Sequence, residues 1–269
     1  GTATSIQKDS KGQMDIEHLD LFNYREKITH ERKKVKGPLP FDINLKSYND
    51  LVQSIVFSLM SENLYRWIVC EGLSEKIYFE HIFSDIDNLK ILPVGGYKEV
   101  KKVYENLLSP INDPDYNVKG KVLCLIDTDE ERLDIDYKKG KRLFFERLLI
   151  NEQGEATLVD VNDNKTKPTE IEDCLDPETY YRTLTFFSQK HEALRQVIQN
   201  NPFIESSSSS ADCMDLRPTD SKIVKDFFNE NRGENKLNFA RKYVELLIEQ
   251  ESEKEQKWIK QIRQKLELD

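Results

Sequence analysis

The residues that decide the fold are Val122-Leu123-Cys124-Leu125-Ile126, followed directly by Asp127-Thr128-Asp129. An uninterrupted apolar run of this length is typical of a strand that is buried on both faces. Such strands belong to parallel sheets whose two faces are covered by helices. This stretch therefore predicts an α/β fold with carboxylates at the end of a buried strand.

Two more short apolar runs lie upstream of this strand, and a helical pattern follows each of them. We expect strands at 67–70 and 89–94, a helix at 74–83 with Ser74 as its N-cap, and a helix at 97–108. Strand and helix then alternate up to residue 126, which is the pattern of two βαβ units. The predicted fold class is α/β, with a Rossmann-like parallel sheet flanked by helices.

The chain is expected to divide into three parts. Residues 1–46 are polar and read as an N-terminal arm or linker. Residues 47–180 read as a helix, marked by an apolar stripe from Tyr48 to Met60, plus the α/β domain. Residues 181–269 read as a mostly helical extension that completes the site.

Three segments outside the βαβ units carry further expectations. The apolar runs 143–150 and 156–161 are predicted to form a hairpin. The serine run 206–210 is predicted to be a flexible linker or loop with no core of its own. The C-terminal segment 236–268 fits either one long helix or two shorter ones.

Composition excludes several classes of protein. The 269 residues carry 40 Lys and Arg against 49 Asp and Glu, a net charge of −9, which disfavours a non-specific nucleic-acid binder that relies on its own positive charge. The four cysteines lack a CxxC pair, which excludes the common structural zinc spacings and is typical of the reducing cytoplasm. No apolar run is long enough to cross a membrane, and no GxxxxGK[ST] motif offers a nucleotide site.

Acidic residues follow two of the three predicted parallel strands. Glu71 follows the first, Asp127 and Asp129 follow the third, and Glu75 lies in the first turn of the helix after Glu71. In parallel α/β sheets, ligands bind beyond the carboxyl ends of the strands. Carboxylates gathered there repel one another unless a divalent cation neutralises them, and oxygen ligands favour Mg²⁺, Mn²⁺ or Ca²⁺. The sequence therefore predicts a metal site at this edge, next to a glycine pair, Gly95-Gly96, that lets the backbone approach a ligand.

Each of these acids also has a purely structural explanation. Glu71 can close a strand, Glu75 can stabilise a helix N-terminus, and Asp127 can cap a loop. An EF-hand loop that begins at Asp127 is excluded because Arg132 stands where that motif needs glycine. A haloacid-dehalogenase-like nucleophile motif is disfavoured because Glu131 stands where it wants Thr or Val. A nucleotide-sugar transferase DxD motif stays open.

The order of the motifs resembles a known domain. A strand with Glu-Gly, a βα unit with a glycine pair, and a strand with Asp-x-Asp look like the Toprim domain of type IA and II topoisomerases, bacterial primases and several nucleases. Within that group, Glu71-Gly72-Leu73-Ser74-Glu75 is similar to the EGxxE motif of the overcoming-lysogenization-defect (OLD) family nucleases. The resemblance extends from about residue 65 to residue 174, and implies a Toprim fold there.

The resemblance also implies a site with two metal ions. Carried over by position, Glu71 and Glu75 would hold one ion, and Asp127 and Asp129 the other or a shared one. The catalytic residues implied are then Glu71, Asp127, Asp129 and a lysine that comes late in the chain.

Two positions of the implied site are not fixed by the motif alone. A further acid is expected after the Asp-x-Asp, and we favour Glu172 over Glu170, because one residue of register decides which side chain faces the site. The family has a lysine just ahead of a helix, which nominates Lys236, with Lys222 as the alternative.

The function that the resemblance implies is metal-dependent hydrolysis of phosphodiester bonds in DNA, or alternatively RNA, with two Mg²⁺ or Mn²⁺ ions. An ABC-type ATPase domain or subunit would be the partner, the chain would be the C-terminal nuclease portion of such a protein, and defence against phage would be its role. Apart from the resemblance, the apolar residues at helical spacing in the C-terminal part (Trp258, Ile259, Ile262 and Leu266) could mediate a homodimer, although an intramolecular core contact is the commoner explanation. The alternatives are a Toprim of the topoisomerase or primase type, or a non-catalytic Toprim-like docking or oligomerisation module that needs no cation.

Overall fold

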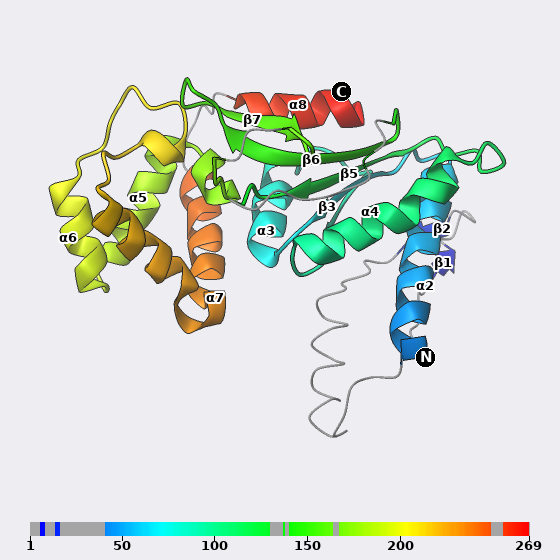
Figure 1. Cartoon of the computed structure of the whole chain (residues 1–269), viewed down its shortest axis with the longest axis horizontal. Coiled ribbons are helices and arrows are strands. Elements are labelled where there is room, and N and C mark those ends of the chain that lie inside the picture. Colours follow the sequence, from blue (N-terminus) through cyan, green and yellow to red (C-terminus); the bar gives the residue numbers. More distant parts are fainter. Residues whose placement is uncertain are drawn as a thin grey trace. The chain divides into compact units, whose positions relative to one another are not determined.

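The computed structural model describes residues 6–8, 14–16, 41–129, 137, 140–163, 167–248 and 255–268, with side chains from residue 48 onward. Strands and helices alternate in its first half, and helices dominate its second half (Figure 1). The elements are β1 (Ile6–Lys8), β2 (Met14–Ile16), α2 (Phe41–Met60), β3 (Arg66–Cys70), α3 (Leu73–Ile82), β4 (Leu89–Pro93), α4 (Tyr97–Asn112), β5 (Lys121–Ile126), β6 (Leu143–Ile150), β7 (Ala156–Asp160), η1 (Ile171–Cys174), α5 (Pro177–Ser188), α6 (Glu192–Asn200), η2 (Ser210–Asp212), α7 (Pro218–Ile248) and α8 (Lys257–Leu266).

The main sheet has the strand order β4-β3-β5-β6-β7. β3 runs parallel to both β4 and β5, with Ile68 paired to Ile91 on one side and to Leu123 on the other. β6 and β7 pair antiparallel, which confirms the predicted hairpin. The α/β class and the mostly parallel, helix-flanked sheet are therefore as expected, and the topology is compatible with a Rossmann-like fold.

The strand residues are apolar because the sheet is covered. Every residue of β3 is buried, and β5 is buried from its second residue to its last. A strand that is buried on both faces needs a continuous apolar run rather than alternation, which is the pattern that the sequence shows. The apolar run that most clearly predicted a strand is thus β5, which Asp127 follows directly.

The residues group into two compact units, and the first comprises Gly1–Gly72, Asp85–Leu125 and Asp136–Phe145. In it, α2 packs against α4 and buries the apolar stripe that the sequence predicted. Gly120 lies where no side chain fits, because a Cβ there would lie 2.1 Å from the carbonyl oxygen of Tyr65. Apart from β1 and β2, which pair antiparallel, the predicted N-terminal arm up to residue 40 lies outside the described residues.

The second unit comprises Leu73–Ser84, Ile126–Ile135 and Glu146–Asp269. In it, α3 packs on α7, and α5, α6 and α7 pack on one another (Figure 1). Aromatic rings fill the space between these helices; Phe239, for example, lies edge-on to Phe228, with 5.0 Å between ring centroids. All the described side chains of the candidate site below, except Glu71, belong to this unit.

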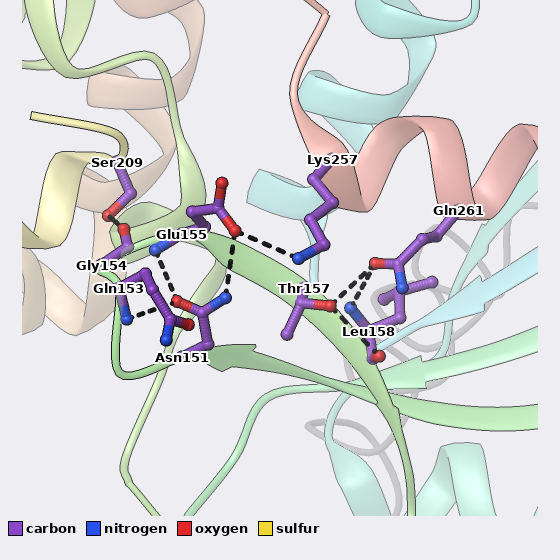
Figure 2. A network of polar contacts seen from close by, with 9 residues as sticks. All are labelled: Asn151, Gln153, Gly154, Glu155, Thr157, Leu158, Ser209, Lys257 and Gln261. Atoms are coloured by element: carbon purple, nitrogen blue, oxygen red, sulfur yellow. Dashed lines mark hydrogen bonds and ion pairs between the residues drawn. The ribbon is translucent and has the colours of Figure 1, made fainter.

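Helix α8 is fastened to β7, the last strand of the sheet (Figure 2). The Gln261 side-chain oxygen accepts hydrogen bonds from the backbone N–H of Leu158, at 2.8 Å, and from the Thr157 hydroxyl, at 3.0 Å. Lys257 on the same helix pairs with Glu155 at 3.1 Å. Because edge strands expose unpaired backbone groups, these contacts protect the edge.

The serine run 206–210 is a loop up to Ser209, as expected, but its end is packed. Ser209 and Ser210 are buried, and Ser210 begins the 3₁₀ helix η2. The Ser209 hydroxyl donates at 2.8 Å to the Gly154 carbonyl, in the loop of the β6–β7 hairpin (Figure 2). The last two serines are therefore a packed part of the second unit and not a free linker, because their hydroxyls satisfy the backbone of segments that are distant in sequence.

Two other expectations are refined. Ser74 is the second residue of α3 rather than its N-cap, and its hydroxyl donates to the Glu75 carboxylate at 2.8 Å instead of capping the helix. The C-terminal segment contains two helices, α7 and α8, of which α7 is itself kinked at residues 230–233. No helix among the described residues is both long and apolar enough to cross a membrane.

Candidate functional site

A short bridge holds two acidic segments of the chain side by side. Thr128 and Thr169 exchange two backbone hydrogen bonds, each of 2.9 Å, in an antiparallel bridge. Both threonines are buried; the Thr128 hydroxyl donates to the Leu148 carbonyl, and the Thr169 hydroxyl accepts from the backbone N–H of Ile150 at 3.2 Å. The bridge therefore ties the segment with Asp127 and Asp129, and the segment that leads to Glu170 and Glu172, to the same strand, β6.

Asp127 and Asp129 flank the buried Thr128. Asp127 is half-buried and Asp129 is exposed. Because side chains alternate along an extended segment, the two carboxylates leave the backbone on the side opposite the Thr128 hydroxyl. Because they are two residues apart, the carboxylates of Asp127 and Asp129 both point away from the core at the carboxyl end of β5.

Glu172 is buried although it is acidic. It lies in η1, with only 3% of its surface exposed. Its Oε1 accepts a hydrogen bond from the Tyr78 hydroxyl on α3, at 3.4 Å. The Ser210 hydroxyl donates to the Glu172 carbonyl at 2.5 Å and accepts from the backbone N–H of Leu175 at 3.0 Å, which fixes the turn that carries Glu172.

Lys236 lies between two of these carboxylates. It follows the kink of α7, and its Nζ lies 2.9 Å from Oε2 of Glu170 and 2.8 Å from Oε2 of Glu172. The Glu170 side chain is half exposed, whereas that of Glu172 is buried. No group among the described residues donates a hydrogen bond in good geometry to Oε2 of Glu172, so its contact with Lys236 is an ion pair.

The charges of these groups shift one another's pKa. Burial raises the pKa of Glu172 to about 7, and the negative charges of Glu75 and Glu170 add to the rise, while Lys236 opposes it. For Lys236, burial lowers the pKa, but the carboxylates of Glu172, Asp127, Glu170 and Glu75 raise it by more, so the net shift is upward. The ammonium is therefore charged throughout the working pH range, and one lysine balances several acids.

The predicted residues thus fall into two groups. Glu75, Asp127, Glu172 and Lys236 lie within one electrostatic environment in the second unit, with Asp129 two residues beyond Asp127. Glu170 and Glu172, the two alternatives for the further acid, both contact Lys236. Lys222 is exposed in the part of α7 that precedes the kink. Glu71 belongs to the first unit, and its place in the site stays a sequence prediction.

Gly95 and Gly96 form hydrogen bonds within the chain. Gly95 and Gly96 have φ of 90° and 109°, and their N–H groups donate to the Glu71 carbonyl at 2.6 and 3.0 Å. Glycine is needed because other residues rarely adopt such backbone angles. The pair therefore closes the turn after β4, and these N–H groups are not directed at a ligand as the sequence suggested.

The donor chemistry fits a hard divalent cation. The acids offer only oxygen ligands, which are the ligands that Mg²⁺ and Mn²⁺ prefer. Among the described residues, no three His, Cys, Asp or Glu side chains are grouped at ligand distances, and Lys236 occupies the contact with Oε2 of Glu172. Glu75, Asp127, Asp129 and Glu172 are the residues that could hold a cation here, and they could do so only after side-chain adjustment.

Sequence reasoning missed the residues that hold Glu172. Tyr78 reads as an ordinary core aromatic of an amphipathic helix, and Ser210 lies in a run that reads as low complexity. Neither gives a local signal, because each acts on a residue far away in the chain.

Comparison with known proteins finds no relative: the chain matches no protein family model, no curated protein and no solved structure.

Proposed function

We propose that this chain is a divalent-cation-dependent phosphodiesterase that acts on nucleic acid, with its site at Glu75, Asp127, Asp129, Glu172 and Lys236. The observation that supports this most is the position of Lys236. A lysine that the resemblance nominated, as a late lysine just ahead of a helix, lies 2.8 Å from Glu172, and the charges of Asp127 and Glu75 raise its pKa. Residues from distant segments thus share one environment.

The chain's own residues have distinct tasks in this proposal. Mg²⁺ or Mn²⁺, when bound, would supply an activated water and neutralise phosphate charge. Glu75, Glu172 and the two aspartates would hold the cations, and Tyr78 and Ser210 keep Glu172 in place. Lys236, which keeps its charge at neutral pH, pairs with a phosphate oxygen and stabilises the negative charge that develops there.

The net charge is consistent with this chemistry. A chain of charge −9 repels nucleic acid unless cations intervene, and a cation-loaded site supplies positive potential where the phosphate binds. From the resemblance to OLD-family nucleases we propose DNA as the first substrate to test, an ABC-type ATPase as the partner, and defence against phage as the setting. Glu71 is proposed as a further ligand on the same ground.

The direct test is nicking of supercoiled plasmid with Mg²⁺, Mn²⁺, Ca²⁺ or EDTA. The chain is compared with an Asp127→Ala/Asp129→Ala variant, and the expected result is nicking that needs Mg²⁺ or Mn²⁺ and is lost in the variant. An RNA substrate and an added ATPase partner are tested in the same assay. Closed, relaxed product, or protein trapped covalently on nicked DNA, would indicate topoisomerase chemistry instead.

A non-catalytic docking module predicts a different result. It cleaves nothing, and its thermal unfolding is the same in EDTA and in Mn²⁺. Stabilisation by Mn²⁺ that the aspartate variant loses would support the cation site even before a substrate is found. Absence of both cleavage and cation binding would contradict the proposed function.

A further inference from the structure

Lys236 has two carboxylate partners with different surroundings. Its Nζ lies 2.9 Å from Glu170 and 2.8 Å from Glu172, but the Glu170 side chain is 49% exposed and that of Glu172 only 4%. Water can solvate Glu170 without help. Glu172 depends on protein groups, since a buried carboxylate without a counter-ion is strongly unfavourable.

Oε2 of Glu172 is a possible partner both for the Lys236 ammonium and for a divalent cation. Oε2 of Glu172 receives the Lys236 ion pair and no hydrogen bond among the described residues. A divalent ion binds a carboxylate oxygen at roughly 2.0–2.6 Å, closer than the ammonium does. Two positive groups on one buried oxygen repel each other, so a metal that binds Glu172 must weaken the contact with Lys236.

We propose that Lys236 is the counter-ion of the cation-free site and competes with the divalent cation for Glu172. When a cation binds, Lys236 leaves Glu172, keeps its contact with Glu170 at the surface, and is thereby free to meet a substrate phosphate. The competition lowers the affinity for cation and keeps the buried carboxylate neutralised at all times. This inference rests on the proposed function only in that a divalent cation enters the site.

The geometry allows this exchange without unfolding the site. Glu172 is held by Tyr78 at Oε1 and by Ser210 at its carbonyl, and neither contact involves Lys236. A lysine side chain is long and rotatable, and the Glu170 carboxylate already lies within contact distance. Only one ion pair is therefore exchanged.

Two measurements test the competition. The first is titration calorimetry with Mn²⁺ on the chain, on Lys236→Met and on Lys222→Met, which removes the same charge from an exposed position on the same helix. We expect Lys236→Met to bind Mn²⁺ about tenfold more tightly, within the usual range of coupling between two ligands. Lys222→Met should change the affinity by no more than about twofold, because surface charges are screened.

The second measurement needs no variant, so it holds even if Lys236→Met fails to fold. Acetylation of each lysine is followed by mass spectrometry with and without saturating Ca²⁺. Release from Glu172 should make Lys236 react about fivefold faster when the cation binds, a coupling of ordinary size, while Lys222 is unchanged.

The outcomes separate this inference from the proposed function. Mn²⁺ binding that is no tighter in Lys236→Met than in Lys222→Met, with Lys236 acetylation unchanged by cation, would overturn the competition and leave the cation site standing. Absence of Mn²⁺ binding in the unmodified chain and in Lys236→Met alike would overturn both.

Discussion

At the scale of single residues, Glu172 is a carboxylate that is buried beside a lysine, as Glu146 is beside Lys265. Pairing a buried acid seldom repays its desolvation in full, so such pairs persist where they serve a purpose beyond stability. Glu172 has a partner at each carboxylate oxygen and one at its carbonyl, and these come from α3, η2 and α7. A side chain held from three directions suits a task that needs a fixed position.

The raised pKa of Glu172 should make the free energy of unfolding depend on pH when EDTA keeps the site free of cations. The pKa of about 7 in the folded state lies above the ordinary glutamate pKa of 4.5, so the folded state binds more protons than the unfolded state between these two pH values. The charged groups around it are Glu75 on α3, Glu170 beside it and Lys236 on α7. The stability it contributes is full below pH about 4.5 and is lost as pH rises through about 7, by up to about 3 kcal/mol.

Urea unfolding at pH 5 and pH 8 measures this effect. Glu172→Gln, which cannot titrate, should flatten the dependence, whereas the exposed control Glu205→Gln should keep it. Equal pH dependence in both variants would show that other groups cause it.

Tyr78 and Tyr243 offer a matched pair at the same scale. Their rings meet edge-on at 5.5 Å; the Tyr78 hydroxyl donates to Glu172, while that of Tyr243 accepts from the backbone N–H of Asp176. Each Tyr→Phe change should cost about 0.5–1.5 kcal/mol, by loss of one hydrogen bond. Only Tyr78→Phe should also slow plasmid nicking, and equal nicking rates in the two variants would argue against a positioning role for Tyr78.

At the scale of elements, local sequence patterns predicted the strands and helices well, but they did not predict which residues distant in sequence would contact one another. The strands and the order of strand and helix follow from apolar runs that are visible within a few residues. Helix α4 continues past its predicted end at residue 108 to Asn112, despite Pro110, because Ile111 is buried and anchors the last turn. Ser209 and Ser210 read as linker because their partners, Gly154 and Glu172, are far away in sequence.

The contact between Glu172 and Lys236 also joins residues that are distant in sequence. The sequence favoured Glu172 over Glu170 and Lys236 over Lys222, but it could not predict their contact, since no periodicity reports which turn faces which helix. The structure brings Glu170 to Lys236 as well, at the surface rather than buried, so both acids have a place.

The edge of the sheet gives an element-scale prediction. Gln261→Ala removes the acceptor for the backbone N–H of Leu158 on β7, and it should lower the free energy of unfolding by about 1–2 kcal/mol. Gln264→Ala, at an exposed position of the same helix, is the control and should change it little. Chemical denaturation of the two variants measures the difference, and an equal loss would mean that helix propensity rather than the edge contact matters.

At the scale of the whole chain, the acidic balance constrains how the proposed nucleic-acid substrate can bind. With a charge of −9 and several carboxylates around one lysine, the site is repulsive to phosphate without cations. Fluorescence anisotropy with a labelled DNA duplex should therefore show binding in Ca²⁺ and none in EDTA. Equal affinity under both conditions would place the nucleic-acid contact elsewhere on the chain.

The proposed contact of Lys236 with the substrate is tested by the rate of plasmid nicking at saturating Mn²⁺ in Lys236→Ala and Lys222→Ala. Saturation removes any effect of Lys236 on cation affinity, so the rate reports its contact with the substrate alone. We expect a loss of about 10²-fold or more for Lys236→Ala, the usual effect of removing a group that stabilises transition-state charge, and a near-normal rate for Lys222→Ala. Equal rates in the two variants would contradict the proposed role of Lys236.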